Sequence, residues 1–365
     1  MRVCILSGIG YGTNYYRATL VKRAIDRWGA PLGVEAFHTH LFSLSFLDPK
    51  SVDVFYLLRP IPEMIPVEML HRLKREGRPI VLDYDDDLFH VPSWSPSSQT
   101  FDLGGIREFC RGVHACPDVI TTTTAAGARI VKEYTPDAET RVIPNAFDPE
   151  LKILRPLPKW QDGDVPNIGW AGGSQHERDL AHLLPVFHEC LRRGYGLTFI
   201  GDGPRGLRGL PGKKIAWVQG THEIEEFHQA LAMVGFNVGL APVVDERFNH
   251  SKSALKPAEY GWYAGCPTVM SDLSCYDEVE DDGQWSHKVK GFDRDLWMAK
   301  IEKALATSRA HGRRYRQPDR YNIRTTMHKW CAAFNRAHQL ARGEDAPGYR
   351  EAPAESPLVL ETSPN

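Results

Sequence analysis

The sequence predicts an α/β protein made of two doubly wound domains, and three observations support this fold class. The chain has 365 residues, more than one hydrophobic core ordinarily serves. Short apolar runs alternate with amphipathic helical patterns, which is typical of parallel sheets covered by helices on both faces. This alternation occurs twice, before and after a proline-containing, mostly polar stretch. We therefore predict an N-terminal domain at residues 1–150, a linker at 151–165 and a C-terminal domain at 166–323.

The N-terminal domain begins with an apolar run at residues 2–7 that we interpret as a buried strand. A glycine loop containing Gly10 and Gly12 follows, and then a helix from about residue 14 to residue 28. The loop lacks the strict G-x-G-x-x-G fingerprint, so its glycines either approach a ligand or only allow a tight turn. Further strands are predicted at 54–58, 79–83, 119–122 and 141–143, and further helices at 63–76, 101–114 and 125–134.

A run of acidic residues follows the predicted strand that ends at Asp83. Asp85, Asp86 and Asp87 would lie at the carboxyl end of this strand, where open α/β sheets place their sites. Crowded carboxylates raise one another's pKa, which suits a general base, so we interpret at least one of the three as catalytic. Two other interpretations stay open. Asp83 and Asp85 could form a D-x-D metal–diphosphate motif, or some of these aspartates could cap a turn or pair with arginines.

The C-terminal domain repeats the pattern. Its first strand runs into a turn formed by Gly172, Gly173 and Ser174, which suits a phosphate group. His176 is either catalytic or a capping or surface residue, and Asp179 is interpreted as a favourable charge in the first turn of the next helix. Strands are predicted at 167–170, 197–200, 215–218, 238–240 and 267–270, and helices at 178–193 and 223–234.

Residues 249–272 carry the clearest indication of a ligand. They read as a polar loop, a helix that begins near Ser253, and a short strand. The start of a helix directs free N–H groups and the positive end of its dipole at an anion, and Lys252 and Lys256 would add positive charge there. Glu259, three residues after Lys256, lies on the same side and can accept two hydrogen bonds from a vicinal diol. An anion site beside a diol site is what a nucleoside diphosphate requires. The alternative interpretation is that both lysines are solvated surface residues.

This stretch resembles the donor-binding segment of GT-B glycosyltransferases of the GT4-like (group 1) family. In that family a glutamate on this helix holds the ribose of a nucleotide sugar, and a Gly-x-Pro turn then precedes a strand. Glu259 and residues 264–267 match this pattern. The family's first glutamate corresponds to Ser251, so the role of that acid is not carried over. Three further segments, at 117–148, 197–204 and 278–285, also resemble sequences of this family and occur in the same order along the chain.

The resemblance implies the GT-B fold, in which two Rossmann-like domains face a cleft and a C-terminal helix, here 324–342, crosses back onto the first domain. It also implies a hexosyl- or pentosyltransferase that moves a sugar, with retention, from a nucleotide-diphosphate-sugar on the second domain to a hydroxyl acceptor on the first. The glycine loop and Arg17 would face the same cleft. The nucleotide sugar is a co-substrate, and neither a cofactor nor a metal is expected. Ser251 motivates a second hypothesis, a nucleotide-sugar-binding protein that has lost catalysis.

Composition restricts the partners and the compartment. The net charge of -2 does not indicate a nucleic-acid or membrane partner. Basic stretches at 205–214 and 309–320 leave open a nucleic acid, with a modified base as acceptor, or an anionic lipid, although such runs are more often solvated faces. The seven cysteines form no C-x-x-C pair, and no apolar segment is long enough to span a bilayer, so we expect a cytoplasmic protein. Residues 343–365, rich in Pro, Glu, Ala and Ser, are expected to be disordered.

Overall fold

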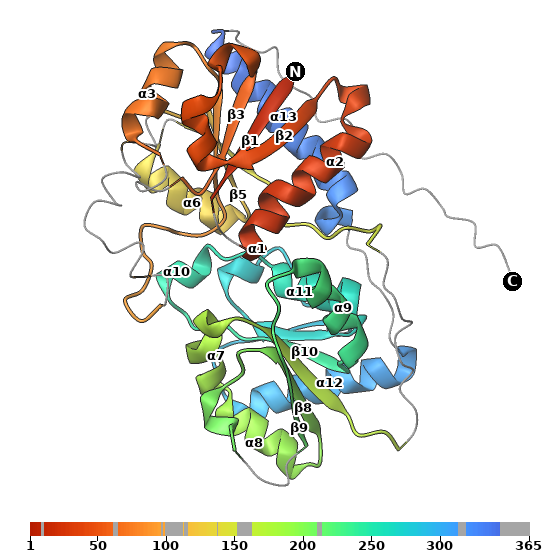
Figure 1. Cartoon of the computed structure of the whole chain (residues 1–365). Helices are drawn as coiled ribbons and strands as arrows, with labels where there is room; N and C mark the ends of the chain where they lie inside the picture. Colours follow the sequence, from red (N-terminus) through yellow and green to blue (C-terminus); the bar gives the residue numbers. More distant parts are fainter. Residues whose placement is uncertain are drawn as a thin grey trace, which may run out of the picture.

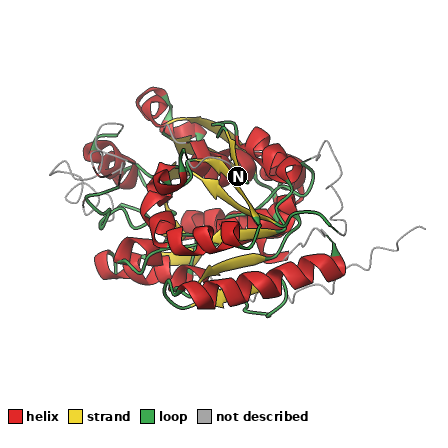
Figure 2. Cartoon of the chain, turned by 90° about the horizontal axis from the view of Figure 1, so that it is seen from below, coloured by secondary structure: helices red, strands yellow, loops and turns green. Residues whose placement is uncertain are grey.

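The computed structural model describes residues 1–8, 11–60, 65–95, 98, 112, 116–136, 138–151, 163–209, 214–312 and 319–343. These residues form two lobes, each built on a parallel six-stranded sheet (Figure 1). Strands lie inside and helices outside in both lobes (Figure 2), which confirms the predicted doubly wound architecture. Most of the helix predicted at 101–114, most of the linker, and residues 344–365 of the predicted tail lie outside the described residues.

The N-terminal sheet has the strand order β2-β1-β3-β4-β5-β6. Its strands are β1 (Arg2–Ser7), β2 (Glu35–His40), β3 (Val54–Leu58), β4 (Ile80–Tyr84), β5 (Val119–Thr122) and β6 (Glu139–Val142). Its helices are α1 (Tyr11–Asn14), α2 (Leu20–Trp28), α3 (Val67–Arg75) and α6 (Ala125–Tyr134), with a π-helical turn at Tyr15–Thr19 between α1 and α2. Val3 and Ile5 of β1 pack in one core, and Cys4 and Leu6 pack in another. Both faces of the sheet are therefore covered, as the alternation of side chains along a buried parallel strand requires.

The C-terminal sheet has the strand order β12-β11-β10-β7-β8-β9. Its strands are β7 (Asn167–Gly172), β8 (Gly196–Gly201), β9 (Ile215–Val218), β10 (Val238–Ala241), β11 (Thr268–Ser271) and β12 (Ser286–Val289). Its helices are α7 (Glu177–His182), α8 (Leu184–Arg192), α9 (Ile224–Val234), α10 (Arg247–His250), α11 (Leu255–Glu259) and α12 (Arg294–His311), and a π-helical turn at Tyr260–Ala264 continues α11. The helix predicted at 178–193 is broken at Leu183, because Pro185 in the first turn of α8 has no N–H to continue the hydrogen-bond ladder.

The last helix, α13 (Ile323–Ala341), returns to the N-terminal lobe and packs against α2, as its position in Figure 1 shows. The segment that leads from the N-terminal lobe to the C-terminal lobe and the segment that leads back lie side by side, because the N–H of Phe147 donates to the carbonyl of Tyr321 over 2.7 Å. On α13, the ring of Trp330 lies 5.1 Å from the ring of Tyr56 in β3. The predicted C-terminal helix that crosses back is therefore present.

The sequence prediction has no counterpart for β2, β12, α10 and α12. Both β2 and β12 are edge strands of their sheets, and β2 has no fully buried residue. Polar edge strands lack the continuous apolar run by which buried parallel strands are recognised. The basic stretch predicted at 309–320 begins in the last turn of α12 and continues into residues that are not described.

Candidate functional site

A cavity of about 1000 Å³ lies between the two lobes. It is bounded by residues that follow β1, β3, β7, β8 and β9 and by helices α9 and α11, so the carboxyl ends of both sheets face it. Its lining consists of Gly8, Gly12, Thr13, Asn14, Tyr16, Leu58 and Arg59 from the N-terminal lobe, and of residues 171–176, 200–202 and 219–222 with Ile224, Phe227, Leu255, Lys256 and Glu259 from the C-terminal lobe. Figure 1 shows α1 at the boundary between the lobes, close to α11.

Glu259 lines this cavity from α11 although only 5% of its surface is exposed. Its Oε1 accepts a short hydrogen bond from the hydroxyl of Tyr16, which belongs to the other lobe. The Nε2 atom of His228 on α9 lies 3.6 Å from the same oxygen. The predicted diol-binding acid is therefore a largely buried carboxylate whose position is set by both lobes.

Lys256 lies one turn before Glu259 on the same wall of the cavity. Its Nζ donates to the carbonyl oxygen of Ala171 over 2.6 Å and lies 5.0 Å from the ring centroid of Trp170. Burial lowers the pKa of Lys256 to about 8. The turn predicted to hold a phosphate also lines the cavity, and a Cβ built on Gly172 would lie 2.7 Å from this Nζ. The ammonium group of Lys256 and residues 172–174 thus border the same space.

His176 lines the cavity and forms a buried pair with Asp179. Its Nδ1 lies 2.8 Å from Oδ2 of Asp179, and Oδ1 of Asp179 accepts the N–H of Val244 over 2.8 Å. Burial and the charges of the nearby lysines lower the pKa of His176 to about 3. Burial alone would raise the pKa of Asp179, but the hydrogen bond from His176 lowers it. A neutral imidazole that donates from Nδ1 has an acceptor at Nε2, and Asp179 orients it rather than serving only as a charge in the first helical turn.

The predicted catalytic aspartates are occupied in other contacts. The carboxylate of Asp87 accepts from Nδ1 of His90 over 2.7 Å and from the N–H of Phe89 over 3.0 Å. The carboxylate of Asp85 accepts the hydroxyl of Thr13 over 2.9 Å and pairs with Arg59, which also pairs with Asp86. None of the three aspartates is among the described residues that line the cavity.

Arg59 is a cavity residue that the sequence analysis did not select. It follows β3 and has a backbone φ of 44°, a conformation that non-glycine residues rarely adopt and that is associated with functional sites. Its guanidinium is held between Asp85 and Asp86 and is partly exposed. The sequence feature that could have identified it is its position directly after an apolar strand, because the carboxyl ends of such strands border the binding cleft of open α/β sheets.

Arg17 does not face the cleft, which corrects the expectation drawn from the resemblance. It is fully buried, and its guanidinium forms a two-point ion pair with Asp83, with an Nε–Oδ1 distance of 3.0 Å and an Nη2–Oδ2 distance of 2.5 Å. Asp83 also accepts the hydroxyl of Thr121 over 2.5 Å. The Arg17 guanidinium lies 4.5 Å from the ring centroid of Trp330 on α13. These contacts tie β4, β5 and α13 of the N-terminal lobe together, and Asp83 is fully buried in its pair with Arg17, away from the cavity where the D-x-D motif considered above would act.

The remaining predicted residues are Gly10, Gly12, Lys252 and Ser253. Gly12 lines the cavity, whereas Gly10 lies outside the described residues. Lys252 and Ser253 are not among its described lining residues, and the Ser253 hydroxyl accepts an N–H from the Asn145 side chain over 3.1 Å. Within the described ranges, no group of three or more His, Cys, Asp or Glu side chains is arranged to hold a metal ion.

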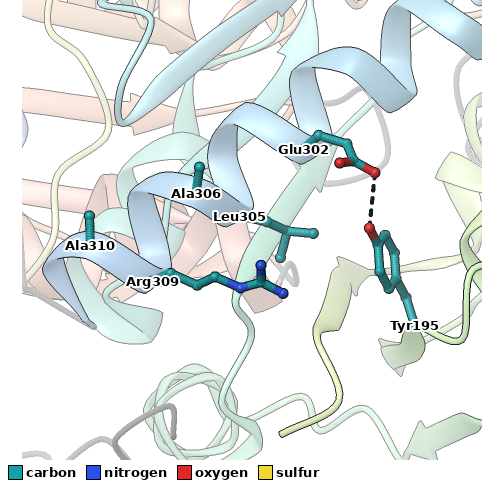
Figure 3. Close-up of a pocket in the computed structure, with 6 residues that line it drawn as sticks. All are labelled: Tyr195, Glu302, Leu305, Ala306, Arg309 and Ala310. Atoms are coloured by element: carbon teal, nitrogen blue, oxygen red, sulfur yellow. Dashed lines mark hydrogen bonds between the residues drawn. The ribbon is translucent and has the colours of Figure 1, made fainter. Parts of the chain in front are cut away.

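A second hollow lies on the C-terminal lobe, between α12 and Tyr195 (Figure 3). The Tyr195 hydroxyl donates to Glu302 over 2.9 Å, so this contact packs the segment between α8 and β8 against α12. Arg309 and Ala310, the first residues of the basic stretch at 309–320, line this hollow, but none of the predicted catalytic or donor-binding residues does. We therefore assign the candidate site to the cavity between the lobes. No helix in the described part of the chain is both long and apolar enough to cross a membrane.

The sequence matches no family model and no curated protein. The structure is similar to sucrose-phosphate synthase from Thermosynechococcus elongatus, with 13% identity, a TM-score of 0.60, and coverage of 94% of this chain and 98% of that one. It is also similar to HepE from Anabaena in complex with UDP and glucose, with 14% identity, a TM-score of 0.58, and coverage of 92% and 99%. An alpha-glucosyltransferase in complex with UDP-glucose and DNA containing an abasic site matches with 13% identity, a TM-score of 0.53, and coverage of 93% and 95%. At these identities the likeness establishes the fold, which is the GT-B fold.

Proposed function

We propose that this protein is a glycosyltransferase that moves a sugar from a nucleoside-diphosphate sugar to a hydroxyl acceptor. The observation that carries the proposal is that Lys256 and Glu259, one turn apart on α11, both line the cavity between the lobes. An ammonium group suits a diphosphate, and a carboxylate suits the vicinal hydroxyls of a ribose. A cavity of about 1000 Å³ is large enough for a nucleotide sugar. HepE and the alpha-glucosyltransferase, which share the fold, are complexed with UDP or UDP-glucose, which favours UDP as the first nucleotide to test.

Sugar transfer requires that the negative charge developing on the departing diphosphate be stabilised. Lys256 and the N–H groups of residues 172–174 are proposed to supply this stabilisation. His176 is proposed to accept a hydrogen bond from the acceptor hydroxyl at Nε2 and so to orient it, because Asp179 holds Nδ1. The acceptor proton is proposed to leave with the diphosphate, whose last pKa of about 6 makes it a stronger base than an imidazole with a pKa of about 3. Arg59, on the opposite wall, is proposed to contact the acceptor or the transferred sugar.

Three finer features belong to the same proposal. We propose retention of configuration, as the family resemblance implies, and a hexose or pentose as the transferred sugar. The acceptor is a hydroxyl of a glycan or lipid, or of a modified base in a nucleic acid. The last class is included because the similar alpha-glucosyltransferase is complexed with DNA. The anomeric configuration of the product, measured by NMR, tests the stereochemical part.

A nucleotide-sugar-binding protein without catalysis is the second candidate. Ser251 favours it, because a serine stands where the resembling family has a glutamate, and its hydroxyl accepts the N–H of Asp87 over 2.8 Å. The three predicted catalytic aspartates also favour it, because they are already engaged in hydrogen bonds or ion pairs within the protein. Donor hydrolysis separates the two functions. Binding of a nucleotide sugar without turnover against any acceptor pool would favour the second candidate.

The test of the donor site is a thermal-shift screen of UDP, GDP, ADP and dTDP and their common sugar derivatives. A ligand at about 100 times its dissociation constant stabilises the folded state by about 2.7 kcal/mol and so raises the melting temperature. Glu259→Gln should weaken the response, whereas Glu68→Gln on the exposed surface of α3 should leave it unchanged. If no nucleotide raises the melting temperature, or if both variants respond like the wild type, the proposed donor site is wrong.

A further inference from the structure

Tyr16 connects the two lobes at the carboxylate that is proposed to hold the ribose. It belongs to the π-helical turn of the N-terminal lobe, whereas His228 and Glu259 belong to α9 and α11 of the C-terminal lobe. The Tyr16 hydroxyl donates to Oε1 of Glu259 and lies 2.6 Å from Nε2 of His228. The exposed fractions of Tyr16, His228 and Glu259 are 4%, 0% and 5%. The three side chains form one hydrogen-bonded chain that is almost closed to solvent.

The direction of these hydrogen bonds follows from counting protons. A tyrosine hydroxyl has one proton, and burial together with the Glu259 carboxylate raises the pKa of Tyr16 well above its ordinary value, so this proton is retained. Because it is donated to Glu259, the contact with His228 must be donated by the N–H at Nε2. The other ring nitrogen of His228, Nδ1, has no hydrogen-bond partner among the described residues. The ring of Tyr263 stacks on the imidazole at 3.8 Å and fixes its plane.

This chain leaves Glu259 able to bind a ligand. A carboxylate offers about four lone-pair directions, and Tyr16 occupies only one of them. Glu259 still lines the cavity while it is held. A carboxylate fixed before the ligand arrives loses less freedom on binding than one that must be ordered at that moment.

We infer that Tyr16 is a positioning residue for Glu259, so that the N-terminal lobe completes the ribose-binding site of the C-terminal lobe. The inference rests on the proposed function and extends it, because that function assigns the contacts with the nucleotide part of the donor to the second lobe alone. Tight binding of a nucleoside diphosphate then requires the closed arrangement of the lobes, in which the Tyr16 hydroxyl reaches the carboxylate. Tyr16 acts only through Glu259 and therefore affects recognition of the ribose hydroxyls rather than of the diphosphate.

The neighbouring residue offers a matched control. Tyr15 is also buried, with 8% of its surface exposed, but its hydroxyl has no hydrogen-bond partner among the described residues. Tyr15→Phe and Tyr16→Phe remove the same atom from adjacent positions. Only the second removes a hydrogen bond to Glu259.

The experiment measures the dissociation constants of UDP and 2′,3′-dideoxy-UDP by calorimetry for the full-length wild type and both variants. The wild type should prefer UDP, because only UDP offers the diol to Glu259. Tyr16→Phe should reduce the ratio of the two dissociation constants about tenfold, which corresponds to the free energy of a hydrogen bond to a charged group. It should do so by weakening the binding of UDP and not that of the dideoxy analogue. Tyr15→Phe should keep the wild-type preference. In a Glu259→Ala background, which leaves no acceptor for the Tyr16 hydroxyl at this position, Tyr16→Phe should cause no further loss.

Failure of the inference and failure of the proposed function give different results. A wild type that binds UDP and its dideoxy analogue equally, or binds neither, overturns the proposed ribose site and the inference with it. A wild-type preference that Tyr16→Phe retains overturns the inference alone. Equal weakening of both ligands by Tyr16→Phe also overturns it, because a general structural role of Tyr16 would have that effect. A Tyr16 effect that persists without the Glu259 carboxylate excludes action through that group.

Discussion

Binding of a nucleoside diphosphate should weaken as the pH rises from 7 to 9, because Lys256 loses its proton in this range. Burial lowers the pKa of Lys256 to about 8, from an ordinary value of about 10.4. The ammonium form therefore falls from about nine-tenths of the population at pH 7 to about one-tenth at pH 9. Since only the charged form attracts the diphosphate, the dissociation constant should rise about tenfold between these two pH values. The phosphate groups of the ligand contribute almost no change of their own, because their last pKa is about 6.

The assay is calorimetric titration with UDP at several pH values and constant ionic strength. Lys256→Met should bind more weakly at pH 7 and should lose the dependence on pH. Lys303→Met, at an exposed position of α12, should behave as the wild type does. A dissociation constant that stays constant in the wild type, or a slope that persists in Lys256→Met, would refute the assignment of Lys256 to the diphosphate.

Two further predictions concern a glycine beside the cavity and the buried ion pair. Gly172→Ala should weaken UDP binding about tenfold, because the added methyl group would lie 2.7 Å from the Nζ of Lys256 and displace it. Gly196→Ala is the control, since its methyl group would meet no atom closer than 3.6 Å, and equal calorimetric affinities for the two variants would contradict the steric argument. Asp83→Asn should lower the free energy of unfolding by about 3–5 kcal/mol, because it leaves Arg17 fully buried without its counter-charge. Urea denaturation measures this loss, and a change below about 1 kcal/mol would show that Arg17 finds another partner.

Local patterns predicted much of the fold and part of the candidate site. The strand predicted at 54–58 has the same bounds as β3, because a buried parallel strand is a continuous apolar run between polar residues. Lys256 and Glu259 were selected because residues three apart on a helix share a face, and both do line the cavity. The turn at Gly172 and the position of His176 likewise follow from residues next to one another in the chain.

Tertiary structure alone decided which charged groups meet the cavity. Arg17 and Arg59 both lie near the carboxyl ends of strands in the N-terminal lobe. Arg17 is nevertheless covered by α13, whereas Arg59 lines the cavity. Tyr16 and Glu259 are hydrogen-bonded although 243 positions separate them in the chain. Periodicity reports only which face of an element is apolar. The pairing of buried polar groups depends on how elements that are distant in the sequence pack against one another. A buried charge without a partner is strongly destabilising, so each buried charge pairs with a group that the tertiary structure places beside it.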